Sequence, residues 1–194
     1  MRQSRSPRLR TPPHSSSSAE RQRSHGWRPA GSCAWWPDLI TRTEHQRGEL
    51  QRLGPGRPSW CYGTPGIARA QQLAGLALGD RDRQHQAEQA LAGCLADNQQ
   101  LAQLTDASLC HGWAGLVQTV SRAAPDAIDD ELTTRLPGLN TRFNEHVDHR
   151  CPPDSTALMD GTAGIHLVRL TDPVNNPVNT AVTAPWDRCL LLTG

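Results

Sequence analysis

The sequence contains no lysine, so all 20 of its basic side chains are arginine. With 19 acidic side chains, the formal net charge is +1, which excludes the strongly basic surface by which proteins attract nucleic acid. Aromatic residues make up only 4% of the 194 residues, and a hydrophobic core must therefore come from Ala, Leu, Val and Trp. That composition favours close-packed helices over a β-sandwich, which is rich in β-branched and aromatic side chains.

Membrane-spanning and secretory features are also missing. No run approaches the roughly 18 apolar residues of a membrane span, and the N-terminus has no apolar signal segment. The six cysteines are widely spaced rather than clustered into a disulfide framework. We therefore expect a cytoplasmic protein with reduced thiols, without a membrane span and without a nucleic-acid partner.

Residues 1–30 consist largely of Arg, Ser, Pro and Gln, with few apolar side chains. Such a segment does not bury enough apolar surface to offset the entropy that is lost on ordering. We expect residues 1–30 to be disordered and residues 31–194 to form the folded part of the chain.

Three Gly-x-x-Gly turns recur along the folded part at a constant interval. They open at Gly63, Gly112 and Gly161, so that successive turns are 49 residues apart, and each leads into an apolar segment. A constant period of this length is typical of stacked helical hairpins. Glycine at these positions suits tight turns and a close approach of helices.

The segments after the turns have the periodicity of helices. After the first turn, apolar residues at i, i+3, i+4, i+7 and i+8 predict an inner helix, and a second such set predicts an amphipathic outer helix. The second unit repeats the plan, breaks at Pro125–Asp126, resumes from 128 to about 136 and continues beyond Pro137–Gly138; a third inner helix is expected near 164–170. The predicted helical positions are Ala70, Leu73, Ala74, Ala77 and Leu78, then Ala87, Ala90, Leu91, Cys94 and Leu95, then Leu116, Val117, Val120 and Ala123. The fold is therefore predicted to be all-α.

Two of the turns carry residues that bind soft metals. Cys61 stands just before the first turn, and Cys110 and His111 stand just before the second. These are ligand types that zinc prefers, and three protein ligands would leave the fourth tetrahedral position open, as in catalytic zinc sites. The competing interpretation is that an isolated cysteine is a small buried hydrophobic residue, and we assign it to Cys94, Cys151 and Cys189. The remaining histidines are interpreted as surface or capping residues.

The same residues carry a family resemblance. Trp60-Cys-Tyr-Gly-Thr-Pro-Gly66 followed by Cys110-His-Gly112 resembles the zinc-site signature of the lanthionine synthetase C family, the cyclases of lanthipeptide biosynthesis. The resemblance runs from about Trp35 to the C-terminus. It implies an α/α toroid, which family members close with seven hairpins. Three are recognisable here, so residues 31–194 would be the C-terminal part of such a domain, an incomplete toroid.

The resemblance also implies a reaction. Zinc held by Cys61, Cys110 and His111 would activate a peptide cysteine thiol for addition to dehydroalanine or dehydrobutyrine, giving a thioether ring. Family members have an active-site arginine four residues before the zinc cysteine, which corresponds to Arg57, and a guanidinium there would stabilise the enolate that forms. The implied partners are a dehydrated precursor peptide and a dehydratase.

The family pattern is incomplete in this sequence. The upstream histidine and aspartate that serve acid–base chemistry in the family have no match, because His25 is followed by no apolar helix and lies only 36 residues before Cys61. We therefore expect a truncated cyclase. Two alternatives stay open: a non-catalytic zinc-binding helical module that docks on a peptide or synthetase partner, and a relative that adds thiols such as glutathione.

Overall fold

The computed structural model describes residues 34–49, 51, 54–150, 153–171 and 186–193. Over these residues the secondary structure is helical, with no strand, which confirms the all-α prediction. No helix in the described part is both long and apolar enough to cross a bilayer. The elements are α2 (Arg42–Arg47), α3 (Thr64–Leu78), α4 (Arg81–Ala96), α5 (Asn98–Leu101), α6 (Trp113–Ala123), η1 (Ala124–Asp126), α7 (Glu131–His149), α8 (Thr162–Thr171) and η2 (Trp186–Leu190).

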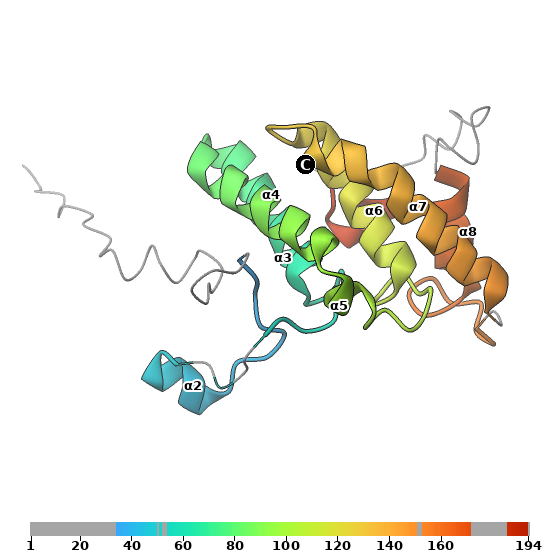
Figure 1. Ribbon diagram of the computed structural model, residues 1–194, viewed down its shortest axis with the longest axis horizontal. Helices are drawn as coiled ribbons and strands as arrows, with labels where there is room; N and C mark the ends of the chain where they lie inside the picture. Colours follow the sequence, from blue (N-terminus) through green and yellow to red (C-terminus); the bar gives the residue numbers. More distant parts are fainter. Residues whose placement is uncertain (1–33, 50, 52–53, 151–152, 172–185, 194) are drawn as a thin grey trace, which may run out of the picture.

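The helices pair into hairpins and the hairpins stand side by side. Helix α3 packs against α4, and α6 packs against α7 (Figure 1). The three helices that follow the glycine turns are also neighbours, because α6 contacts α3 on one flank and α8 on the other. The repeat seen in the sequence is therefore a repeat in space, with α3, α6 and α8 as the inner helices.

Helix α6 lies in the middle of this array and is buried on nearly every side. Its apolar positions Leu116, Val117, Val120 and Ala123 are all in the core, as their spacing predicts. The predicted stripe on α4 is likewise buried, from Ala87 to Leu95. A neighbour on each flank thus accounts for the continuous apolar character of the central unit.

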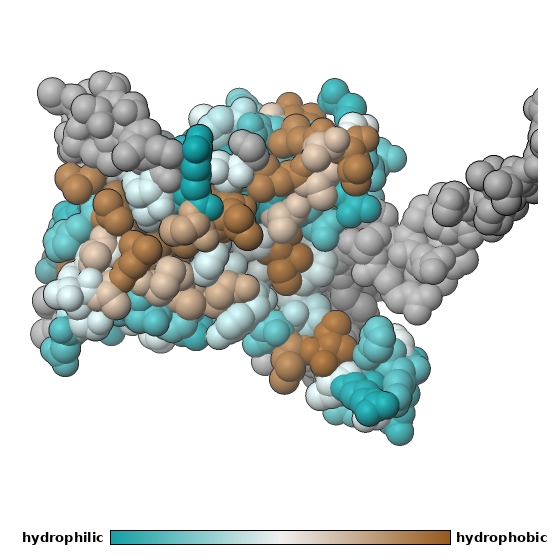
Figure 2. All heavy atoms as spheres, turned by 180° about the vertical axis from the view of Figure 1, so that it is seen from behind, coloured by the Kyte–Doolittle hydropathy of each residue, from teal (hydrophilic) through white to brown (hydrophobic). Residues whose placement is uncertain are grey.

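Helix α3 buries a different face from the one its apolar stripe suggests. Of that stripe, Ala70, Ala77 and Leu78 are exposed, and Leu78 retains 72% of its accessible surface. The chain instead buries Ala68 and the polar side chains that alternate with the stripe. Apolar residues are visible in patches across the rear face of the molecule in Figure 2. Among the described residues, the outer flank of α3 therefore has no neighbour of the kind that α6 has on both flanks.

The buried polar face of α3 is satisfied by a hydrogen-bond network. Arg69 is 2% exposed; its Nε donates to the Leu192 carbonyl at 2.8 Å and its Nη2 pairs with Asp126 at 2.7 Å. Next to it, Gln72 donates to Glu88 of α4 at 2.8 Å. Burial of these groups costs little because each has a partner, and the network ties α3 to α4, to η1 and to the C-terminal segment.

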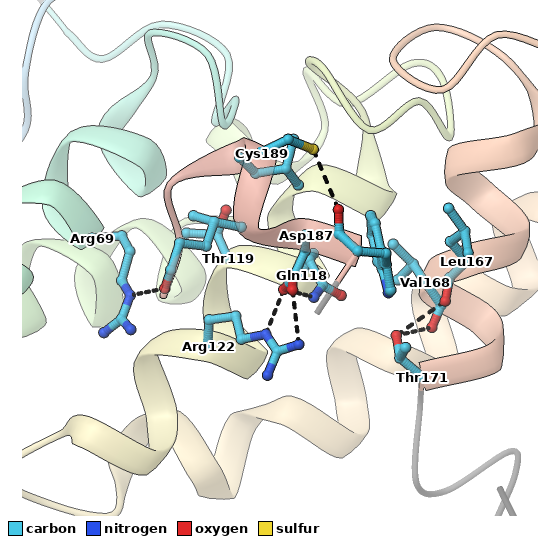
Figure 3. Close-up of polar contacts among 12 residues, drawn as sticks. Arg69, Gln118, Thr119, Arg122, Leu167, Val168, Thr171, Asp187 and Cys189 are labelled. Carbon is cyan, nitrogen blue, oxygen red and sulfur yellow. Dashed lines mark hydrogen bonds and ion pairs between the residues drawn. The ribbon is translucent and has the colours of Figure 1, made fainter. Parts of the chain in front are cut away.

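The C-terminal turn η2 is tied to helix α6 by a buried carboxylate (Figure 3). Asp187 is fully buried and accepts hydrogen bonds from Gln118 at 2.6 Å and from Arg122, whose Nη2 lies at 3.0 Å. A few residues on, the Leu190 carbonyl accepts from the indole Nε1 of Trp60 at 3.0 Å. The end of the chain therefore touches the segment that leads into the first glycine turn.

Helix α7 continues without interruption through Pro137–Gly138. The sequence indicated helix on both sides of this pair, and the structure joins them into one helix of 19 residues. Proline removes the hydrogen bond to the carbonyl four residues earlier. That carbonyl belongs to Thr133, which is exposed, so water can satisfy it.

Other sequence expectations have mixed outcomes. Cys94 is buried, as predicted, but the prediction of a buried Cys189 is wrong, because that residue is exposed and its Sγ lies 3.3 Å from the Trp186 carbonyl. Residues 1–30, for which disorder is predicted, lie outside the described residues together with His14 and His25. So does Cys151.

Candidate functional site

The three glycine turns share one close backbone approach, and the first two also share a backbone hydrogen bond. In the first turn the Gly63 amide donates to the Ser59 carbonyl at 3.2 Å, and in the second the Gly112 amide donates to the Ser108 carbonyl at 3.1 Å. The second glycine of each turn has no room for a side chain, since a Cβ would overlap a backbone carbonyl six residues earlier. The pairs are Gly66 with Trp60, Gly115 with Leu109, and Gly164 with Leu158.

Hydrogen bonds between the turns set them side by side. The Cys61 amide donates to the Cys110 carbonyl at 3.4 Å, and one repeat further on the Cys110 amide donates to the Met159 carbonyl at 2.9 Å. These are equivalent positions, so the same bond joins turn one to turn two and turn two to turn three. The turns lie at the N-terminal ends of α3, α6 and α8, and Cys61 and Cys110 are therefore neighbours despite their separation in sequence.

The two thiols influence each other. Burial is the main cause that raises the pKa of Cys110 to about 11, followed by a hydrogen bond that the Cys110 thiol donates to Cys61, the charge of Cys61 and the carboxylate of Asp160; the Arg57 charge opposes the rise. The phenol of Tyr62 also has a raised pKa, chiefly because of the adjacent Cys61. Tyr62 is 51% exposed, whereas Trp60 packs against the core.

His111 sits between two carboxylates and a hydroxyl. Its Nδ1 lies 3.0 Å from Ser108 Oγ and 3.3 Å from Asp106 Oδ2. Its Nε2 lies 3.7 Å from Oδ1 of Asp160, which occupies in the third turn the position that His111 has in the second. The imidazole is thus held on its Nδ1 side, while its Nε2 side faces the neighbouring turn.

Arg57 lies close enough to join this group. Its Nη1 is 3.7 Å from Asp106 Oδ2, with both side chains a little over one third exposed. Burial by itself would raise the pKa of Asp106, but hydrogen bonds from Ser108 and the positive charges of His111 and Arg57 outweigh it and hold the pKa below its usual value. The Asp106 carboxylate is therefore ionised at neutral pH.

The donor set suits zinc in type, and the structure tests its arrangement. Two thiols and an imidazole are ligands that zinc prefers. Cys61 and Cys110 interact, and His111 follows Cys110 directly, yet no three His, Cys, Asp or Glu side chains in the described part of the chain are placed to hold a metal ion. The backbone thus brings the donors onto adjacent turns, and metal binding would require their side chains to rotate toward one point.

Sequence reasoning missed Asp106 and Asp160. Asp160 had a signal, because alignment of the three turns places it in register with His111. Asp106 had a weaker one: its Oδ1 accepts from the Ser108 amide at 2.8 Å, a local turn that Asp-x-Ser favours but does not require. His45, on α2, is exposed, and no contact of the described structure joins it to the group around His111.

Comparisons with known proteins identify a matching family and a related fold. The family described as "Lanthionine synthetase C-like protein" matches residues 21–190. The nisin biosynthesis protein NisC of Lactococcus lactis subsp. lactis is 25% identical over 134 residues, which cover 69% of this chain and 31% of that protein. The solved structure of a nisin cyclase is 22% identical with a TM-score of 0.63, over 81% of this chain and 37% of that one, and shows the likeness in fold. The chain thus spans about a third of the length of these relatives.

Proposed function

Because the chain belongs to the lanthionine synthetase C-like family, we propose that residues 31–194 form the zinc-binding part of a lanthipeptide cyclase. The proposed reaction adds a cysteine thiol of a precursor peptide to a dehydroalanine or dehydrobutyrine, which a preceding dehydration supplies. The observation that carries the proposal is the hydrogen bond between turns, from Cys61 to Cys110, which makes neighbours of the two thiols and of His111.

Cys61, Cys110 and His111 are the proposed zinc ligands. Zinc bound there would lower the pKa of a substrate thiol well below its free value of about 8.5, which is the chemistry that the metal supplies. The Cys110 thiol itself has a pKa of about 11 without metal. Binding a cation would therefore displace a proton from it, as metal binding by thiols does in general.

Arg57 is proposed to stabilise the charge that develops on the substrate. In the addition, the sulfur lone pair forms the S–C bond at the β-carbon, and the alkene electron pair moves toward the carbonyl oxygen as an enolate. A guanidinium is permanently charged and donates hydrogen bonds to oxygen, so it favours this state. Arg57 is partly exposed beside the second turn, where a bound peptide could reach it.

Protonation of the α-carbon completes the addition. No described residue near the turns corresponds to the upstream histidine that serves this acid–base chemistry in the family. A positioned acid typically contributes about 10²–10⁴-fold, and an enclosing site adds through orientation. We therefore expect residues 1–194 alone to cyclise a dehydrated peptide no faster than the uncatalysed background. A version extended with further family hairpins is expected to be active and to depend on Cys61. Loss of alkylatable thiol measures both, and rapid zinc-dependent cyclisation by the 194-residue chain would refute the need for an additional acid.

Metal analysis tests the proposed site directly. We expect about one zinc per folded chain, and Cys61→Ala or Cys110→Ala to lose most of it, because two ligands remain in each variant. Cys94→Ala is the matched control, since Cys94 is a buried cysteine of α4 away from the turns. Unchanged zinc in both site variants would remove Cys61 and Cys110 from the site.

The exposed flank of α3 favours one alternative, a zinc-binding module that acts by docking on a partner. Leu76 and Leu78 leave large apolar surfaces uncovered there, and exposed apolar faces often mark binding sites. A glutathione-adding relative would have the same donor set. Cyclisation assays with and without glutathione distinguish the three, because a docking module consumes neither thiol.

A further inference from the structure

Asp106 makes different contacts with its two carboxylate oxygens. Oδ1 accepts the Ser108 amide at 2.8 Å and so belongs to the backbone of the second turn. Oδ2 lies 3.3 Å from Nδ1 of His111 and 3.7 Å from Nη1 of Arg57. One carboxylate oxygen therefore contacts the two side chains, from two different turns, to which the proposed chemistry assigns a role.

The position of this carboxylate is fixed by its surroundings. The Asp106 carbonyl accepts the Trp113 amide at 3.1 Å, at the first residue of α6. A Cβ at residue 112 would overlap Oδ1 of Asp106 and the amide nitrogen of Ser108, so only glycine fits there. The glycine that opens the second turn thus leaves room for the carboxylate as well as for the backbone.

The contact with His111 selects one form of the imidazole. An ionised carboxylate only accepts hydrogen bonds and so favours a proton on the ring nitrogen that faces it. Asp106 Oδ2 is nearer to Nδ1, at 3.3 Å, than Asp160 Oδ1 is to Nε2, at 3.7 Å, so Nδ1 is favoured as the protonated nitrogen. The hydroxyl of Ser108, 3.0 Å from the same Nδ1, can accept as well as donate and is compatible with this assignment. With the proton on Nδ1, the neutral ring has its lone pair on Nε2, and a ligating histidine binds metal through that lone pair.

We propose that Asp106 is a positioning residue that holds His111 as the Nδ1-protonated tautomer, with Nε2 as its ligand atom, and keeps Arg57 beside it. The inference rests on the proposed function for its meaning, since the metal gives Nε2 its role. The tautomer itself is a property of the metal-free chain. Groups in the equivalent relation to ligating histidines typically change metal affinity by about 10–100-fold when they are replaced.

The substitution Asp106→Asn makes a sharp test because it preserves the shape of the side chain. If the new amide oxygen keeps the Ser108 amide as its donor, the NH2 group takes the place of Oδ2 and faces Nδ1. A donor in that position requires Nδ1 to accept, so the tautomer should invert to Nε2–H. Asp97→Asn is the matched control: Asp97 also accepts backbone amides, from Gln99 and Gln100, but it caps α5.

The experiment uses nitrogen NMR of the histidine rings in the full metal-free chain at about pH 8, above the reference pKa of about 6.5 for a free imidazole. His111 is assigned by comparison with His111→Ala. We expect Nδ1–H in the wild type and in Asp97→Asn, and Nε2–H in Asp106→Asn. Zinc titration should then give a Kd about 10–100-fold weaker for Asp106→Asn than for either.

The proposal is overturned if wild-type His111 is the Nε2–H tautomer, a result that needs no variant to fold. It is also overturned if Asp106→Asn folds with the tautomer and the zinc Kd both unchanged. A tautomer that inverts in a chain that binds no zinc would support the positioning by Asp106 and would refute the metal site instead. The outcome for Asp106 is thus separate from the outcome for the cyclase.

Discussion

Removal of the buried Asp187 carboxylate should loosen the C-terminal turn from helix α6. In Asp187→Ala, the amide of Gln118 loses its partner, and Gln118 is only 3% exposed. An unsatisfied buried donor costs about 1–3 kcal/mol. Arg122 loses two hydrogen bonds but is 37% exposed and can be rehydrated, so its loss is discounted to about 1 kcal/mol. Together, these two losses are expected to lower the free energy of unfolding of Asp187→Ala by about 3 kcal/mol.

Urea unfolding monitored by circular dichroism measures the change in the free energy of unfolding, and thermal unfolding measures the corresponding change in Tm. A domain of this size loses about 2–4 °C in Tm for each kcal/mol, so Asp187→Ala is expected to melt roughly 6–12 °C lower than the wild type. The control is Asp148→Ala, which breaks the partly exposed pair with Arg169 and should cost under about 1 kcal/mol. A free energy of unfolding for Asp187→Ala within about 0.5 kcal/mol of wild type would refute the anchoring of η2 described above.

Three further predictions follow from the packing. Gly115→Ala should abolish or severely reduce folding, because its Cβ would overlap the Leu109 carbonyl, whereas Gly138→Ala, with open space around it in α7, should stabilise by about 0.5–1 kcal/mol; chemical denaturation of both variants checks this. Burial, with a smaller effect of the Asp97 charge, raises the pKa of Cys94 to about 12, so its contribution to stability is complete below its unfolded pKa near 9 and is lost as the pH rises toward 12. Cys94→Ala should therefore flatten the alkaline loss of Tm, and an unchanged alkaline slope would contradict the assignment. Leu78→Glu on α3 should change the unfolding free energy by under about 0.5 kcal/mol, because Leu78 is mostly exposed, and a larger loss would mean that this flank is covered.

The sequence predicted the repeat because glycine is required there by the backbone itself. A Cβ at Gly66, Gly115 or Gly164 would overlap a backbone carbonyl, so each of these positions requires glycine. The structural repeat therefore appears in the sequence as glycines at a constant interval. The apolar stripes of α4 and α6 were equally informative, since both helices have neighbours on the flank that the stripe faces.

The face of α3 was harder to infer. Its stripe predicted a helix correctly but gave no sign that the chain buries Arg69 and Gln72, because those side chains are stabilised by partners far along the sequence. The same reason explains why Asp106 was missed: its contacts with Arg57 and His111 depend on how two turns meet, and no local pattern encodes that. Cys189 was misassigned because composition alone does not reveal which face of a short turn looks outward.

The ligand set of the metal is the central claim, and X-ray absorption at the zinc edge of the zinc-loaded chain tests it most directly. The account predicts two sulfur neighbours at about 2.3 Å and one imidazole nitrogen at about 2.0–2.1 Å, with one further light atom completing the tetrahedron. Cys61→Ala should reduce the sulfur count to one. A first shell without sulfur, or one with four sulfurs, would contradict the assignment of Cys61, Cys110 and His111.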